Sequence, residues 1–354
     1  MYRHITLILL SISIIFSAAP VAAENVNFWP GSNSVSSTSV NEIANGINDQ
    51  VLFATGNGLS IYEDGKWTRL YSKATTKIGY LDGIPYDNYV FCLEYDIYNN
   101  LWLGYGGALQ IYDGYTQPLT YSYDQRVIPS YAITDLKRIG DQMWIAIGDM
   151  GVCCYQNGEW IWLPPSESGL GDATQVTQMA VDYASGSLVV TSNQYYISDG
   201  EPHQHVMRPD SPNYPYFDDI VSPYLKSDMY NVRSGTHGGV YFFNRDAIVF
   251  YEPKSDAVTP VLRVGQLDRE AVRINDLAVA PDNTLVIATN LGVFGVKDNA
   301  IVKRLTHKET VLNEIKKVFV DKNNRWWYVN KYLVGYYYDE DTYKAVSAIE
   351  LQNA

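Results

Sequence analysis

A short pattern of hydrophobic and polar positions recurs seven times along the chain. Each copy runs from a polar turn into a strongly apolar strand, then through a glycine or polar turn into a second strand that ends near Asp-Gly or Asn-Gly. The apolar strands occupy residues 50–55, 100–105, 142–147, 187–192, 239–244, 284–289 and 325–330. Anchor positions within them, from Leu52 in the first copy to Trp327 in the last, are 41 to 52 residues apart, about 46 on average.

A repeat of this length accommodates four short strands. Such a sheet has two apolar faces that one copy alone cannot bury, so the copies must stack on one another. Radial stacking also protects the strand edges. The pattern therefore predicts an all-β fold, a seven-bladed β-propeller of four-stranded antiparallel blades.

The turns between the expected strands support this interpretation. Asp64-Gly65, Asp113-Gly114, Asn157-Gly158 and Asp199-Gly200 have the residue types of tight hairpin turns between a third and a fourth strand. Segments such as 274–280 and 315–320 alternate as first strands should, and the anchor strands are almost continuously apolar, as expected of strands covered on both faces.

The first 23 residues lie outside the repeat. Arg3 precedes the apolar run 5–16, and Val21-Ala22-Ala23 then offers a signal-peptidase site before Glu24. A predominantly apolar run of twelve residues is too short to span a bilayer, which argues against a membrane anchor. We expect a signal peptide at 1–23, a single propeller domain at 24–354, and a secreted or extracytoplasmic location without a stable membrane span.

Charge and cysteine content restrict the possible partners and cross-links. A net charge of −13 disfavours nucleic acid or an anionic membrane as the main partner. With three cysteines, Cys92, Cys153 and Cys154, the fold does not depend on a disulfide framework. Neighbouring strand residues point to opposite faces, so at most one of Cys153 and Cys154 can meet Cys92. Buried thiols are the favoured interpretation, with a vicinal disulfide as the alternative.

The segment 321–329, Asp-Lys-Asn-Asn-Arg-Trp-Trp-Tyr-Val, resembles the repeat of the two-component regulator propeller family, and Asp96 to Tyr105 matches it as well. The resemblance covers about residues 40 to 340. It implies a propeller of the kind that usually serves as the extracytoplasmic sensor of a membrane histidine kinase, often tuned to oligosaccharides. No transmembrane helix, kinase or response-regulator segment follows the repeats, so the resemblance implies a stand-alone exported binding module.

The connections between copies are long and rich in tyrosine, of which the chain has 30. In a propeller these connections surround one mouth of the central channel. A tyrosine ring offers a flat apolar face with one hydroxyl, which suits the C–H faces of sugars, although long loops also need aromatic residues for their own packing. The candidate ligand-binding residues are Tyr86, Tyr89, Tyr123, Arg126, Tyr131, Tyr216, Asp218, Asp219 and Arg273. The proline-rich insertion 201–228 is long enough to cap the mouth.

Signals for catalysis are weak. The five histidines form no zinc-protease pattern, and the chain has neither a nucleophile elbow nor a phosphate-binding loop. His203 and His205 supply only two imidazoles, and Asp218 and Asp219 are adjacent, whereas a glycosidase pair usually comes from separate segments. No catalytic residue, metal site or cofactor is predicted.

Three functions remain open at this stage. The first is a non-enzymatic module that binds a glycan or another small ligand at the channel mouth. The second is a surface scaffold that recruits a protein partner through an apolar rim. The third is a polysaccharide lyase or glycosidase, in which acidic, His or Arg side chains from three or more blades would converge in one pocket. Both chain ends offer a candidate outer strand for ring closure, 26–29 and 343–349.

Overall fold

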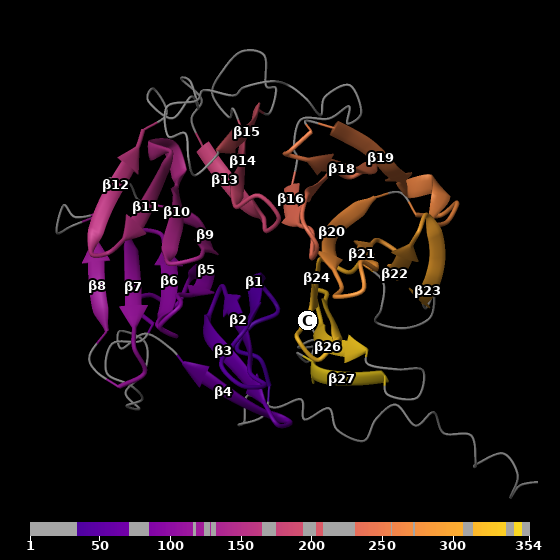
Figure 1. Ribbon diagram of the computed structural model, residues 1–354. Helices are drawn as coiled ribbons and strands as arrows, with labels where there is room; N and C mark the ends of the chain where they lie inside the picture. Colours follow the sequence, from indigo (N-terminus) through magenta and orange to yellow (C-terminus); the bar gives the residue numbers. More distant parts are fainter. Residues whose placement is uncertain are drawn as a thin grey trace, which may run out of the picture.

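The computed structural model describes residues 34–70, 85–115, 118–123, 128, 132–164, 175–193, 203–207, 231–255, 257–271, 273–306, 314–337 and 343–348. They form seven antiparallel sheets, called sheets 1 to 7 in chain order, each built from consecutive strands. Figure 1 shows these sheets arranged in a ring about a common centre.

The strands of the first half of the ring have the following bounds. Sheet 1 contains β1 (Val40–Asn45), β2 (Val51–Thr55), β3 (Gly58–Glu63) and β4 (Lys66–Leu70). Sheet 2 contains β5 (Val90–Tyr95), β6 (Leu101–Tyr105), β7 (Ala108–Tyr112) and β8 (Leu119–Ser122). Sheet 3 contains β9 (Ile133–Ile139), β10 (Gln142–Ile147), β11 (Val152–Gln156) and β12 (Glu159–Leu163). Sheet 4 contains β13 (Gln175–Asp182), β14 (Ser187–Asn193) and β15 (His203–Met207).

The second half of the ring continues the same order. Sheet 5 contains β16 (Asn231–Ser234), β17 (Val240–Phe243), β18 (Ala247–Glu252) and β19 (Ala257–Arg263). Sheet 6 contains β20 (Ile274–Val279), β21 (Leu285–Thr289), β22 (Gly292–Lys297) and β23 (Ala300–Thr306). Sheet 7 contains β24 (Lys317–Val320), β25 (Trp326–Val329), β26 (Leu333–Tyr337) and β27 (Tyr343–Ala348). Two short 3₁₀ helices are η1 (Gly148–Met150) and η2 (Val264–Gln266).

The prediction of an all-β propeller with four-stranded antiparallel blades is confirmed. Six sheets have four strands, and sheet 4 has three within the described part of the chain. One turn assignment was wrong: β15 pairs directly with β14, so the strand after Asp199-Gly200 is the third of its sheet and not the fourth. Asp199-Gly200 itself lies outside the described residues.

Local sequence explains why the strands form where they do. The anchor strands β2, β6 and β21 are buried along their whole length, as expected for strands covered on both faces. The hairpin prediction is confirmed at Asn157-Gly158, where both residues have positive φ, 53° and 84°. This backbone twist matches the twist of the flanking strands.

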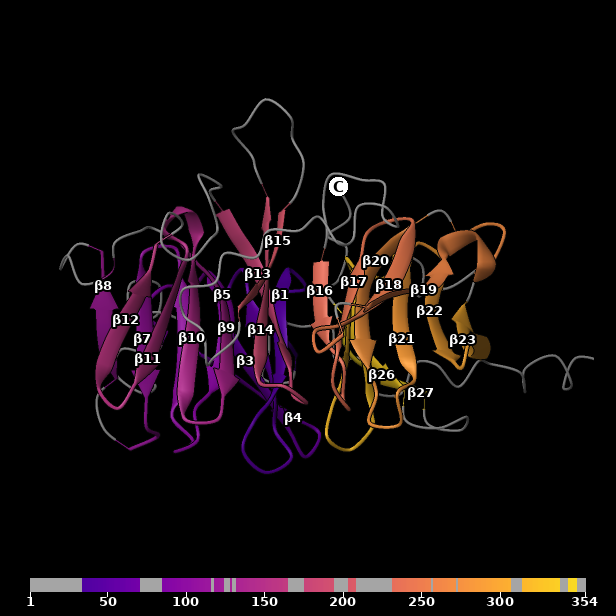
Figure 2. The ribbon, with the colours of Figure 1, turned by 45° about the horizontal axis from the view of Figure 1, so that its top comes forward.

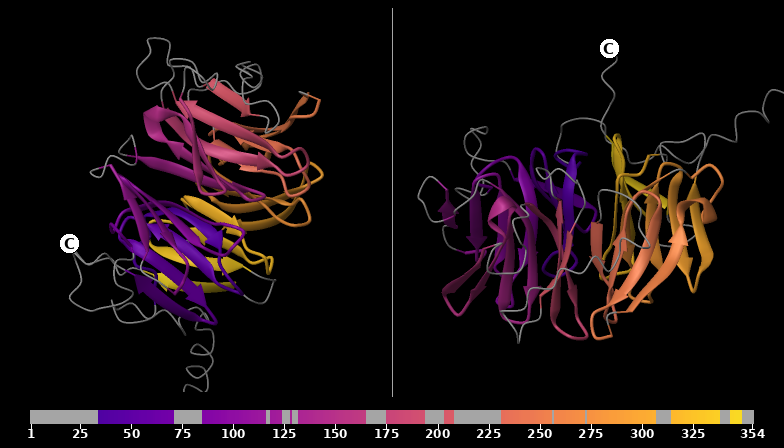
Figure 3. Two further views of the ribbon diagram at one scale, coloured as in Figure 1. Left: turned by 60° about the vertical axis from the view of Figure 1, so that its left-hand side comes forward. Right: turned by 90° about the horizontal axis from the view of Figure 1, so that it is seen from above.

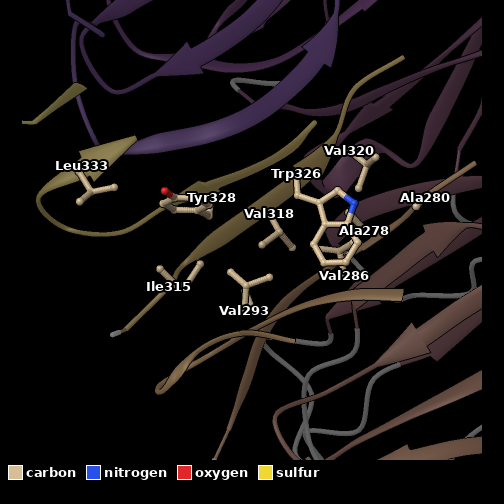
Figure 4. Close-up of a cluster of buried hydrophobic side chains, with 11 residues drawn as sticks. Ala278, Ala280, Val286, Val293, Ile315, Val318, Val320, Trp326, Tyr328 and Leu333 are labelled. Atoms are coloured by element: carbon tan, nitrogen blue, oxygen red, sulfur yellow. The ribbon is translucent and has the colours of Figure 1, made fainter. Parts of the chain in front are cut away.

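The described residues form seven separate hydrophobic cores, one between each pair of neighbouring sheets. Their buried side chains always come from two adjacent sheets, in the pairs 1–2, 2–3, 3–4, 4–5, 5–6, 6–7 and 7–1. Figure 4 shows the core between sheets 6 and 7, where Trp326 of β25 lies against Ala278 and Val286 of sheet 6. Each sheet is therefore stabilised by its neighbours rather than by a core of its own.

The ring closes between sheets 1 and 7 through side chains. The rings of Phe53 and Trp327 pack edge to face with centroids 5.3 Å apart, and Thr38 Oγ1 donates a hydrogen bond to the Lys331 carbonyl at 2.8 Å. Of the two candidate closing strands, 343–349 corresponds to β27, which pairs with β26 of its own sheet. The other, 26–29, lies outside the described residues.

The three cysteines are buried, free thiols, as the sequence favoured. Burial raises the pKa of the Cys153 thiol to about 12, and the neighbouring Cys154 adds to this rise. These thiols therefore stay protonated and pack as small apolar groups.

The strands run between two ends of the ring, as Figures 2 and 3 show from several directions. We call one end the connection rim, where the chain passes from one sheet to the next and where second and third strands are joined. The other end, with the turns between first and second and between third and fourth strands, is the hairpin rim. Within the described residues no helix is long and apolar enough to cross a membrane.

Candidate functional site

Four of the seven innermost strands share a four-residue motif of an apolar residue, a short side chain, a polar residue and a second apolar residue. The copies are Val40-Asn41-Glu42-Ile43, Ile133-Thr134-Asp135-Leu136, Val176-Thr177-Gln178-Met179 and Ile274-Asn275-Asp276-Leu277, with the variant Val90-Phe91-Cys92-Leu93 in sheet 2. In all five strands the pairing register shifts at the second residue of the motif. A β-bulge at the same place thus re-aims the side chains around the centre of the ring.

The bulged motif joins several sheets to the next by hydrogen bonds. In sheets 1, 3 and 6 its second residue donates to a carbonyl at the start of the following sheet, as when Asn41 Nδ2 reaches the Val90 carbonyl at 2.7 Å. Its third residue accepts from the following innermost strand: the Leu93 N–H donates to Glu42 Oε2 at 2.8 Å, and the Met179 N–H donates to Asp135 Oδ2 at 2.6 Å. These polar residues therefore hold the ring together as well as lining it.

A cavity of about 500 Å³ runs along the centre of the ring. Residues of all seven innermost strands, β1, β5, β9, β13, β16, β20 and β24, line it. Its volume lies within the range of roughly 300–1,000 Å³ that is typical of small-molecule sites. The sequence did not predict which side chains face this channel.

Charged side chains from three neighbouring sheets converge in the channel around Lys137. Its ammonium lies 2.7 Å from Asp135 Oδ1 and 3.2 Å from Glu42 Oε1, and it also donates to the Leu136 carbonyl at 2.9 Å. An ammonium group has three donors, and all three are used. Burial lowers the pKa of Lys137, but the carboxylates of Asp135, Glu42 and Glu94 raise it above its ordinary value, so the charge is retained.

A second charged pair lies in sheets 5 and 6. Arg233 Nη2 donates to Asp276 Oδ1 at 2.6 Å, while its other nitrogens donate to the Leu277 and Val232 carbonyls at 3.1 and 2.8 Å. Asp276 Oδ2 accepts the Val318 N–H of sheet 7 at 3.2 Å. The guanidinium and the carboxylate are thus held by the scaffold on both sides.

Glu94 differs from the other channel carboxylates because Lys137 has no donor left for it. Its Oε1 accepts only the Tyr95 N–H, at 2.9 Å, among the described residues. Burial raises the pKa of Glu94 to about 7, although Lys137 and the Tyr95 N–H act to lower it. Glu94 is therefore a channel group that titrates near neutral pH.

Replacing Glu94 by Gln is expected to remove a pH dependence of stability. The folded pKa, about 7, exceeds the ordinary value of 4.5, so the folded chain keeps a proton that the unfolded chain releases between these values. The stabilising contribution of protonated Glu94 is therefore fully present below pH 4.5 and is lost as pH rises to 7. In urea unfolding, the unfolding free energy of E94Q relative to that of the native chain should rise by ~2–3 kcal/mol between about pH 5 and 8. Parallel pH profiles for the two proteins would contradict the assignment.

Of the candidate ligand residues, Tyr86 and Tyr89 lie on the same connection of the connection rim, before β5. The Tyr86 N–H donates to the buried Tyr105 hydroxyl at 3.2 Å, and the Tyr89 N–H donates to Asp87 Oδ1 at 3.0 Å. These bonds fix the backbone while the side chains remain 45% and 44% exposed. The Tyr89 ring packs 4.7 Å from that of Phe91, which lines the channel.

The other described candidates lie elsewhere on the same rim. Tyr123 follows β8 and donates its N–H to the Gly107 carbonyl at 2.9 Å. Arg273 precedes β20 of sheet 6 and forms an ion pair with Glu314. Tyr86 and Tyr89 therefore share one connection, whereas sheet 6 is not a neighbour of sheet 2, so Arg273 is separate from them. Arg126, Tyr131, Tyr216, Asp218 and Asp219 lie outside the described residues.

Sequence reasoning missed Phe91 and the charged groups of the channel. Glu42, Asp135, Gln178 and Asp276 stand at the same position of the recurring motif, a regularity that an alignment of these strands displays. Phe91 occupies the bulge position of its own copy. The recurring motif was visible in the sequence, but it indicates hydrogen bonds between neighbouring strands and not the chemistry of a ligand.

Comparison with known proteins identifies the fold and no family. No family model matches the chain, and no curated protein matches it. The extracellular domain of the putative one-component system BT4673 from B. thetaiotaomicron superimposes with a TM-score of 0.61 at 15% identity, covering 88% of this chain and 39% of that one. The chain thus spans about two fifths of the length of this neighbour.

Two further solved structures have the same architecture. Virginiamycin B lyase from Staphylococcus aureus has a TM-score of 0.60 at 13% identity, with coverage of 84% of this chain and 94% of the lyase. PorZ, a bacterial surface component of the type-IX secretion system of Porphyromonas gingivalis, has a TM-score of 0.52 at 15% identity, with coverage of 89% and 48%. At these identities the likeness shows the propeller fold alone.

Proposed function

We propose that the chain is an exported, non-enzymatic seven-bladed propeller module, with sheet 4 as its fourth blade, that binds a glycan or another small extracytoplasmic ligand at the channel mouth. The observation that carries the proposal is the exposed Tyr89, whose ring packs against the channel-lining Phe91, with the exposed Tyr86 on the same connection. Phe91 in turn lines a polar cavity of about 500 Å³.

The chemistry of the site supports a hydroxylated ligand. Aromatic faces at the mouth suit the apolar faces of sugar rings, and a channel with carboxylate, ammonium and guanidinium groups offers both acceptors and donors for hydroxyls. Glu94 has acceptor capacity that its only described hydrogen bond, from Tyr95, leaves unused. Arg126, Tyr131, Tyr216, Asp218 and Asp219 remain predicted contributors to the same mouth.

The channel charges favour binding over catalysis. Side chains of sheets 1, 2 and 3 do converge, as an enzyme would require, yet Lys137, Glu42 and Asp135 use their hydrogen bonds on one another and on the backbone. A general acid or base must reach substrate, and these groups are committed to the scaffold. No cofactor or metal enters the proposal.

Export and family membership are part of the proposal. The apolar segment 5–16 and the site before Glu24 support a signal peptide. The fold neighbours include the extracellular domain of the putative hybrid two-component system BT4673 and a bacterial surface component, which agrees with an extracytoplasmic location and with a two-component regulator type of propeller.

The double variant Y86A/Y89A is expected to lose glycan binding while the chain stays folded, because both residues are more than two fifths exposed. Stacking contacts of this kind contribute about 0.5–1.5 kcal/mol each, so losing two should weaken binding by about tenfold or more. The measurement is a glycan array followed by calorimetric titration of any glycan retained. Tyr98, 74% exposed on the β5–β6 turn of the hairpin rim, supplies the matched control Y98A. Equal binding by Y86A/Y89A and Y98A would contradict the site.

A second candidate function is recruitment of a protein partner. Outer strands of sheets 2 and 3 expose Leu119, Ile161 and Trp162 at 53%, 47% and 38%. Exposed large apolar side chains on outer strands are one feature of protein interaction surfaces. Cross-linking of the native chain and of W162A to partners from its own membrane fraction tests this candidate, because a partner lost only in W162A supports it.

A further inference from the structure

A second, smaller cavity opens on the hairpin rim, at the end of the ring opposite the proposed mouth. It has a volume of about 230 Å³ and is lined by the β13–β14 turn, by β17, β18 and the turns of sheet 5, and by the β20–β21 turn. Three neighbouring sheets thus contribute to one pocket. Its volume lies below the roughly 300–1,000 Å³ of drug-sized sites, so it fits a single ring and not an oligomer.

Two glycines make the pocket possible and fix its shape. Gly238 and Gly239 have φ of 109° and 70°, and a Cβ on Gly239 would overlap the Phe250 ring. The Gly239 N–H donates to Asp182 Oδ1 at 2.7 Å. Asp182 also accepts the Ala184 N–H and the Ser185 hydroxyl, so its carboxylate builds the wall and is not free for a ligand. The backbone wall of the pocket is therefore preformed.

The polar groups that remain available are of mixed type. His237 Nδ1 lies 2.9 Å from Asn283 Oδ1; because an amide oxygen only accepts, Nδ1 carries the hydrogen and Nε2 of the neutral ring is left as an acceptor. Within the described chain, Lys254 makes no hydrogen bond or ion pair, and its ammonium acts on Asp182 only at longer range. Glu252 Oε2 accepts the Ser255 hydroxyl at 2.6 Å.

An aromatic wall completes the pocket. The rings of Tyr241 and Phe250 are tilted by 54° with centroids 4.9 Å apart, and both are only partly buried. Burial raises the pKa of Tyr241, so its hydroxyl stays neutral. The pocket thus combines a partly exposed apolar face with a donor-only ammonium, an acceptor-only carboxylate and an imidazole acceptor.

From this geometry we propose that the hairpin-rim pocket binds one neutral hexose unit. Sugar hydroxyls both donate and accept, so one ring can satisfy Lys254, Glu252 and His237 at once while its C–H face lies on the aromatic wall. A charged ligand fits less well, because the Glu252 carboxylate repels an anion and the Lys254 ammonium repels a cation. This site is independent of the proposed channel mouth.

The test is a titration of the full chain with methyl glucoside, methyl galactoside and methyl mannoside, alongside glucuronate and glucosamine as charged probes. The readout is the side-chain NMR signal of His237, assigned with H237Q. At least one neutral glycoside should shift this signal saturably. K254A should weaken that binding by about tenfold, the effect of one hydrogen bond to a charged group. The matched control K322A removes another exposed lysine of the same rim and should leave binding unchanged.

Three results would overturn the proposal: no shift of His237 with any of the three neutral glycosides, tighter binding of glucuronate or glucosamine than of all three, or equal affinities for K254A and K322A. Y86A/Y89A should leave this binding intact. Failure of this site is therefore distinguishable from failure of the channel mouth.

Discussion

Replacing Asp135 by Ala is expected to lower the unfolding free energy by about 3–5 kcal/mol, the usual cost of removing one partner from a buried ion pair. The Asp135 side chain is 9% exposed and lies 2.7 Å from Lys137. Its other oxygen accepts the Met179 N–H of the next sheet. The variant therefore leaves an ammonium short of one carboxylate and a buried N–H without its acceptor, and it weakens the contact between sheets 3 and 4.

The measurement is urea unfolding of D135A at neutral pH, compared with D49A. Asp49 is 64% exposed and lies 3.6 Å from Lys322, so its removal should cost less than about 1 kcal/mol. D135N, which keeps the shape and one acceptor oxygen, should fall between the two. If D135A and D49A lose the same small amount, the cluster around Lys137 does not stabilise the ring.

The repeat was predictable because it reflects burial. Anchor strands such as β2 and β21 are covered on both faces, so they must be apolar along their length, and this requirement recurs once in every sheet. The hairpin turns were predictable for a local reason, since Asn157-Gly158 adopts the positive φ that few other pairs tolerate. The hairpin signal depends on residues that are adjacent in the sequence, and the anchor-strand signal recurs at a nearly regular spacing.

The channel was not predicted because its chemistry depends on register. Glu42 and Lys137 are 95 residues apart in the sequence. They lie on strands β1 and β9, whose side chains are re-aimed by bulges at Asn41 and Thr134. A bulge changes which face a side chain occupies, and alternation alone does not show it. The recurring aliphatic, Asn or Thr, polar and aliphatic motif does mark these bulges once its copies are aligned.

The rim was predicted in composition but not in arrangement. Exposed tyrosines on the connections were expected, and Tyr86 and Tyr89 agree with that expectation. Arg273, by contrast, forms an ion pair with Glu314 of the next connection, which composition does not reveal. Side chains of long connections take their positions from distant segments, so sequence predicts the type of surface and not its partners.

Replacing Gly292 by Ala is expected to cost about 2–6 kcal/mol, the sum of backbone strain and overpacking. Gly292 has φ of 144°, and a Cβ there would overlap the Leu305 carbonyl oxygen and approach Thr306 Cα at 3.0 Å. Both contacts are with the backbone of β23, whose ladder to β22 fixes it in place. Neither atom can move aside without breaking hydrogen bonds of sheet 6.

Gly107 supplies a matched control for this prediction, because it occupies the corresponding turn of sheet 2 with φ of 153°, and a Cβ added to it would meet no described atom within 4 Å. G107A should therefore show only the backbone strain, about 1–3 kcal/mol. The difference between the two variants in urea unfolding isolates the contact with β23. Equal losses of unfolding free energy would mean that β23 shifts to accommodate the added Cβ. The outer strand of sheet 6 would then not be held rigidly in place.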